Sequence, residues 1–171
     1  MTKEIALTLA LLVPVILFCG CSSHIARQKF REIRSAAKAI DKAVEDTTLS
    51  YEQFGGLVKK LNDEIARTKP EVTTAEEKEL LNSYDELLAM YQDSYTLWEY
   101  KIGCSQYAWI PQGRVYVDVR VRTLVEKYHF PTESHVVQIT NHNWESISAD
   151  SIKLIWEKAH DRLKKIRDPL W

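Results

Sequence analysis

Cys104 and His135 are the two side chains in this sequence that together could do covalent chemistry. A thiolate is a strong nucleophile, and a neighbouring histidine can lower the pKa of the thiol and act as its general base. His135 begins the β-branched segment 135–140, which predicts an extended stretch of chain. This pair of residue types is the one that a cysteine hydrolase would need.

The segment Cys104-Ser-Gln-Tyr107 resembles the Asp-Cys-Ser-Gly motif of the envelope cysteine peptidases, which cut cell-wall peptides. The resemblance implies Cys104 as nucleophile and His135 as base. The sequence departs from the motif, because Gly103 stands in place of aspartate and Gln106 in place of glycine. The spacing from cysteine to histidine is also shorter than in that family. We therefore keep a peptidase-like enzyme as the alternative function and predict no catalytic residue.

Three histidines, with two glutamates near them, are ligand types that zinc accepts: His129, His135 and His142 with Glu133 and Glu145. Their spacings of six and seven residues match no compact ligand motif. An ordinary polar surface loop is the favoured interpretation, and we predict no metal site. The sequence also has no Gly-rich phosphate loop and no Ser-His-Asp signature, so we predict no cofactor.

Aromatic residues are dense in the second half of the chain. Several recur at helical spacing and are predicted to be core. Tyr100, Trp109 and Trp171 fall off the helical faces, and they are the candidate partner-contact residues. Rings with polar tips suit either the sugar rings of a cell wall or an anchoring contact with a protein partner.

The start of the chain has the order of a secretory signal. An uncharged run over residues 5–18 is about fourteen residues long, short of the ~20 that a membrane-spanning helix needs. Leu17-Phe-Cys-Gly-Cys21 then resembles a lipobox, the cleavage signal of bacterial lipoproteins, although Phe18 replaces the usual leucine. An uncleaved single-span anchor and an ordinary buried helix are the alternatives.

The lipobox resemblance implies a signal peptide over residues 1–20, lipid attached to Cys21 and a membrane anchor. Ser22 is not the aspartate that commonly retains lipoproteins at the inner membrane, so the outer membrane, facing the periplasm, is favoured if the cell is Gram-negative. The first amphipathic face begins near Ala26, and a five-residue tether spans at most ~17 Å. We therefore expect the folded body to lie close to the membrane, with a membrane-proximal envelope protein as partner.

Removing residues 1–20 from the 171-residue chain leaves enough for one domain, residues 21–171, with its own core. The 23 basic and 24 acidic residues nearly cancel, and this balance argues against a nucleic-acid partner. Cys104 would be the one cysteine left without lipid, so packing rather than disulfides must hold the fold. We expect Cys104 to be buried.

Apolar spacings of three and four predict an all-α fold, a bundle of about four or five helices with one short extended segment. Ser50 and Gln53 have the form of a capping box, and Thr74 can cap the next helix. Gly55-Gly56 predicts close packing or a kink. Further helices are expected from the sequence near 26–44, from Thr74 to Ile102, and from Ser148 or Asp150 to Ile166.

Residues 114–122 fit two patterns. The valines alternate with charged residues as in a strand, yet Val117, Val121, Leu124 and Tyr128 also share a helical face. The helical interpretation extends to Tyr128, where the alternation stops, and we prefer it, with the helix ending before Pro131. Together these features predict a lipid-anchored, non-enzymatic binding or adaptor module of the cell envelope.

Overall fold

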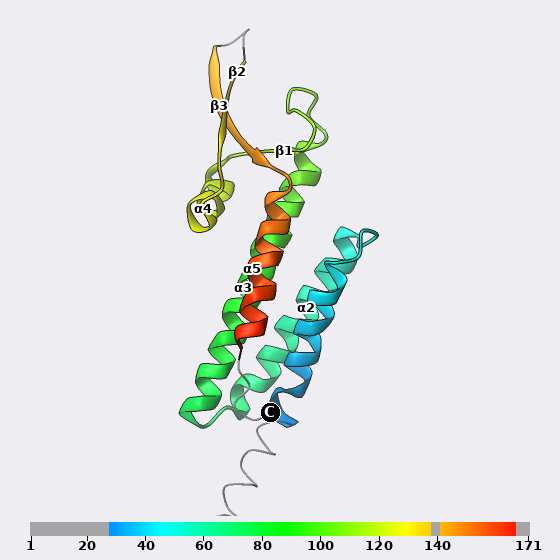
Figure 1. Cartoon of the computed structure of the whole chain (residues 1–171), viewed down its shortest axis with the longest axis vertical. Helices are drawn as coiled ribbons and strands as arrows, with labels where there is room; N and C mark the ends of the chain where they lie inside the picture. The colour runs from blue at the N-terminus through cyan, green and yellow to red at the C-terminus, as the bar shows by residue number, and fades with distance from the viewer. Residues whose placement is uncertain (1–27, 138–140, 167–171) are drawn as a thin grey trace, which may run out of the picture.

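The computed structural model describes residues 28–137 and 141–166, and there the chain is mostly helical with one small antiparallel sheet (Figure 1). The predicted helical class is confirmed in this coarse form. The expectation of a single extended segment is wrong, because the described residues contain three paired strands. The signal peptide with its boundary at residue 20, Cys21 and Trp171 lie outside the described residues.

Four long helices run along the length of the molecule (Figure 1). They are the N-terminal helix (residues 28–43), α2 (Tyr51–Thr68), α3 (Ala75–Cys104) and α5 (Ser151–Lys165). A short 3-10 turn, η1 (Lys69–Glu71), joins α2 to α3. At 1.5 Å per residue the 30 residues of α3 extend about 45 Å. This helix reaches from the end where the N-terminal helix begins to the sheet at the opposite end (Figure 1).

Local capping explains where two of these helices begin. The Ser50 side chain accepts from the backbone N–H of Gln53, and the Gln53 side chain accepts from the backbone N–H of Ser50. Thr74 and Glu77 form the same reciprocal pair at the start of α3. The predicted caps are confirmed, and each pair satisfies two N–H groups that a helix terminus leaves open.

The sheet consists of β1 (Arg114–Tyr116), β2 (Glu133–Val137) and β3 (His142–Ser148), in the order β1-β3-β2. Between β1 and β2 lies α4 (Val119–Tyr128), which ends before Pro131 as predicted. The preferred helix over 114–128 is therefore wrong in its first residues and right in the rest. Asp118 explains why the chain changes from strand to helix at this point. Its side chain accepts a hydrogen bond from the backbone N–H of Val121 and caps the first turn of α4.

Two hydrophobic cores share α3. The first lies inside the bundle and contains Phe54, Tyr84 and Tyr91, while the second lies at the sheet end and contains Val115 and Ile147. Three partly buried side chains pack against both cores: Met90, Trp98 and Trp156. Each core is continuous with the other through these side chains. Among the described helices, none is long and apolar enough to span a membrane.

Gly55 of α2 lies close to a side chain of α3. A Cβ on Gly55 would lie 2.8 Å from Cε2 of Tyr95, whose ring is stacked on Tyr51 with centroids 4.4 Å apart. A Cβ on Gly56 would meet nothing within 4 Å. The close packing predicted for the glycine pair is therefore confirmed at Gly55 alone.

This difference gives a matched pair of variants. Gly55→Ala should lower the free energy of unfolding by about 1–3 kcal/mol, because the stacked tyrosines cannot move aside without loss of packing. Gly56→Ala should raise it by roughly 0.5–1 kcal/mol, since alanine is the better helix former. Urea unfolding of both variants measures the two effects. If both substitutions changed the free energy of unfolding in the same direction and by the same amount, the close contact at Gly55 would be contradicted.

Candidate functional site

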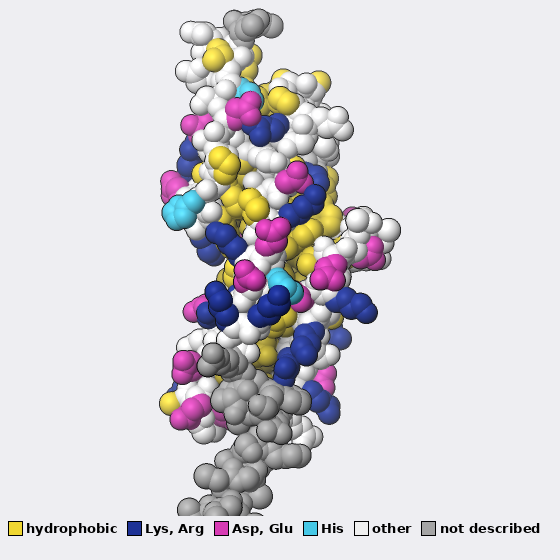
Figure 2. Space-filling view, in the orientation of Figure 1, with side chains coloured by type: hydrophobic (Ala, Val, Ile, Leu, Met, Phe, Trp, Pro, Cys, Tyr) yellow, Lys and Arg dark blue, Asp and Glu magenta, His cyan; other side chains and the backbone are white. Residues whose placement is uncertain are grey.

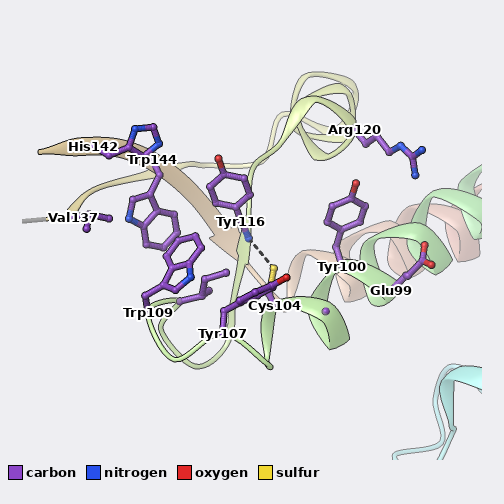
Figure 3. Close-up of a pocket in the computed structure, with 12 residues that line it drawn as sticks. Glu99, Tyr100, Cys104, Tyr107, Trp109, Tyr116, Arg120, Val137, His142 and Trp144 are labelled. Atoms are coloured by element: carbon purple, nitrogen blue, oxygen red, sulfur yellow. Dashed lines mark hydrogen bonds between the residues drawn. The ribbon is translucent and has the colours of Figure 1, made fainter. Parts of the chain in front are cut away.

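A pocket of about 910 Å³ opens at the sheet end of the molecule (Figure 3). Its walls come from the last turns of α3, the loop over residues 105–113, β1 and the β2–β3 pair, with Arg120 from α4. This volume is in the range of small-molecule binding sites. The lining is rich in aromatic side chains and consists of Glu99, Tyr100, Gly103, Cys104, Tyr107, Trp109, Ile110, Tyr116, Arg120, Val137, His142 and Trp144.

The strand register decides which sheet residues reach the pocket. Val115 pairs with Ile147, and both are fully buried in the sheet-end core. Side chains alternate between the two faces of a sheet, so the neighbours of this pair point the other way. The opposite face therefore carries Tyr116 and Trp144, which line the pocket together with Val137 and His142.

Trp109 is the centre of a ring cluster on the pocket wall. Its ring lies nearly perpendicular to the rings of Trp144 and Tyr116, with centroids 5.1 and 5.8 Å away. Tyr107 lies 6.1 Å from it on the other side. Trp144 is buried, whereas Trp109 and Tyr107 remain 52% and 57% exposed. Edge-to-face contacts thus hold the exposed ring of Trp109 in place, and Tyr107 packs against that ring in a tilted arrangement.

Tyr100 lies on the opposite wall of the pocket, near Arg120 (Figure 3). Its hydroxyl donates to Oδ2 of Asp118 at 2.6 Å. This hydrogen bond, followed by burial, raises the pKa of Tyr100 above its ordinary value. Burial opposes ionisation of Asp118, but hydrogen bonds from Tyr100 and from the backbone N–H of Val121 keep its pKa below the usual range. The hydroxyl is therefore a fixed donor that ties α3 to the start of α4.

The charged side chains of the pocket wall balance one another. Glu99 and Arg120 are exposed and lie on the same side of the pocket in Figure 3. His142, on the far side, is also exposed. Over the wider surface, acidic and basic side chains are interspersed on the face shown in Figure 2. Among the residues that line the pocket, Glu99 and Arg120 therefore contribute one negative and one positive charge.

Cys104 and His135 have different partners. The Cys104 thiol is buried as expected, and its sulfur accepts from the backbone N–H of Tyr116 at 3.3 Å. The His135 ring stacks on Trp144 at 4.1 Å, and its Nε2 lies 2.8 Å from the hydroxyl of Ser146. These contacts join α3 to β1 and β2 to β3. Within the described residues, no group of three or more His, Cys, Asp or Glu side chains is placed to hold a metal ion.

Two of the candidate contact residues, Tyr100 and Trp109, line the same pocket, while Trp171 lies outside the described residues. Sequence reasoning missed Tyr116, Trp144 and Arg120. The alternation of residues 114–121 carried a signal for Tyr116, because a strand there would place it on one face with Arg114. The sequence carried no comparable signal for Trp144. The residue two positions along β3 on the same face is Ser146, which is buried but polar, so the apolar alternation of a strand is missing there.

Comparison of the chain with family models, curated proteins and solved structures finds no match. The function must therefore be inferred from the pocket and the sequence.

The contacts of Cys104 predict a structural role for its thiol. Cys104→Ala should cost about 1–3 kcal/mol in unfolding free energy, because it removes the acceptor for the Tyr116 N–H and leaves a small void. Cys104→Ser keeps an acceptor and should cost less. In a chain that also carries Cys19→Ser and Cys21→Ser, the wild-type thiol should react with a thiol reagent only as the protein unfolds. Rapid reaction in the native state would contradict this role.

Proposed function

We propose that this chain is a lipid-anchored, non-enzymatic binding module of the bacterial cell envelope, and that the aromatic pocket is its ligand site. The pocket is the observation that carries the proposal. A concave site of this volume, lined largely by aromatic side chains, is typical of a place where a small ligand binds. Here the exposed ring of Trp109 is held edge-to-face by Trp144 and Tyr116, and Tyr107 packs against it, so this surface is formed before the ligand arrives.

The bundle sets where that pocket lies relative to the proposed anchor. The N-terminal helix, blue in Figure 1, begins at the end of the bundle opposite the sheet. The seven residues from Cys21 to residue 28 span at most about 25 Å when extended. Lipid on Cys21 would keep the base of the bundle near the membrane, and the pocket lies at the other end of α3, a helix about 45 Å long. The partner we propose is therefore a membrane-proximal envelope component within reach of that end of the molecule.

The anchor is tested by Cys21→Ser. In a bacterial host fed with labelled palmitate, the wild-type chain should take up label and sediment with membranes. The variant should lose the label, because no other cysteine follows a lipobox-like segment. Labelling of Cys21→Ser at the level of the wild-type chain would rule out the lipid anchor.

The ligand site is tested by a photoreactive amino acid placed at residue 109 in living cells. Val119 provides the matched control, because it is 86% exposed on α4 but does not line the pocket. Illumination should give a defined adduct with an envelope component from position 109 and not from position 119. Equal adducts at both positions, or none at 109, would show that the pocket is not a privileged binding site.

A further inference from the structure

The pocket combines ring faces with a polar rim that is electrically balanced, and this combination restricts its ligand. We infer that the pocket binds an uncharged carbohydrate chain, with sugar rings resting against Trp109 and Tyr107. The inference rests on the proposed function and specifies the chemistry of the same site.

Charge is the first restriction. One carboxylate, Glu99, and one guanidinium, Arg120, line the pocket, and both are exposed. A strongly anionic ligand would be attracted by Arg120 and repelled by Glu99, and a strongly cationic ligand the reverse. A hydroxyl group both donates and accepts hydrogen bonds, so it can use the carboxylate as acceptor and the guanidinium as donor. A ligand rich in hydroxyl groups and without net charge therefore suits this pair.

The exposed rings are the second restriction. A sugar ring has a flat face of C–H bonds, which packs against an aromatic ring, and a perimeter of hydroxyl groups that stay in contact with water. Trp109 and Tyr107 are half-exposed, so a ligand stacked on them keeps one side in solvent. A fully apolar chain would leave much of its own surface in water at such a site and would gain less from it.

The backbone of β1 is the third restriction, because it excludes the commonest way of binding a peptide at a sheet edge. Val117 donates to the Glu145 carbonyl of β3, and antiparallel alternation then turns the N–H groups of Arg114 and Tyr116 outward. Both are already occupied: Arg114 donates to the Pro111 carbonyl, and Tyr116 donates to the Cys104 sulfur. A peptide cannot add here as a further strand without breaking these bonds. Recognition at this wall must use side chains.

The volume of the pocket indicates how large the ligand is. A volume of about 910 Å³ is near the upper end of the range for small-molecule sites. In Figure 3 the ring cluster of Trp109, Tyr116 and Trp144 lies at one side of the pocket, and Tyr100, Glu99 and Arg120 lie at the other. A short oligosaccharide that lies along the pocket would contact the residues on both sides.

The chain provides its own spectroscopic probes for this inference. Of its five tryptophans, Trp109 and Trp144 line the pocket, whereas Trp98 and Trp156 pack at the junction of the two cores. The full-length chain in detergent is titrated with two uncharged tetrasaccharides, cellotetraose and the tetramer of N-acetylglucosamine, while the indole N–H signals are followed by NMR. At least one tetramer should shift the Trp109 and Trp144 signals and leave the other two in place.

Trp109→Ala should weaken this binding about tenfold or more, because it removes the stacking surface. Leu154→Ala, an exposed apolar residue on α5 outside the pocket, is the matched control and should bind as the wild-type chain does. The fully deacetylated, cationic form of the aminosugar tetramer should bind more weakly than the uncharged form. The Trp144 signal reports whether the pocket of the variant is still folded.

Three outcomes overturn the carbohydrate inference. One is that neither tetramer shifts the pocket signals at millimolar concentration, and another is that binding survives Trp109→Ala unchanged. The third is that an apolar peptide shifts these signals and the sugars do not. In that case the chain remains a binding module with a different ligand, so this result leaves the proposed function intact. Absence of a position-specific adduct in cells would instead count against the proposed function itself.

Discussion

The hydrogen bond from the Trp156 indole to the Ser94 hydroxyl, 3.0 Å long, lies where the two hydrophobic cores meet. Ser94 is fully buried, and its hydroxyl donates to the carbonyl of Tyr91, which orients its oxygen toward the indole. A buried indole N–H needs such a partner, because burial without one costs free energy. The bond therefore fixes α5 against α3 at one register. Both cores depend on that register, since α3 and α5 are the helices that contribute to each of them.

From this junction the position of the pocket follows step by step. The last turns of α3 continue past the bundle and carry Tyr100 and Cys104 to the sheet end. Tyr100 then binds the cap of α4 through Asp118, and Cys104 binds the backbone of β1. These two contacts join one helix to both neighbouring elements, so the pocket walls cannot separate without breaking a bond. A wall held in this way loses little conformational entropy when a ligand stacks on it.

The sequence predicted most reliably what is decided locally. The capping pairs Ser50–Gln53 and Thr74–Glu77 require only residues three apart, and the amphipathic spacing of α2 and α3 is likewise a local property. The strands are different, because three residues of β1 are extended only through pairing with β3, far along the chain. Trp144 faces the pocket for the same reason. Strand register thus brings Tyr116 and Trp144 to one face, and the loop over residues 105–113 adds Trp109 and Tyr107. Local sequence patterns could indicate these residues but could not predict that they meet.

The proposed lipid anchor and the proposed carbohydrate ligand are compatible, because together they would make binding multivalent. A carbohydrate polymer of the cell envelope presents the same unit many times, and a lipid anchor would present many copies of this chain on one surface. Under these conditions each pocket needs only modest affinity, because binding at one place raises the effective concentration at the next. An open pocket with two half-exposed rings and a single pair of opposite charges is suited to such weak, repeated contact.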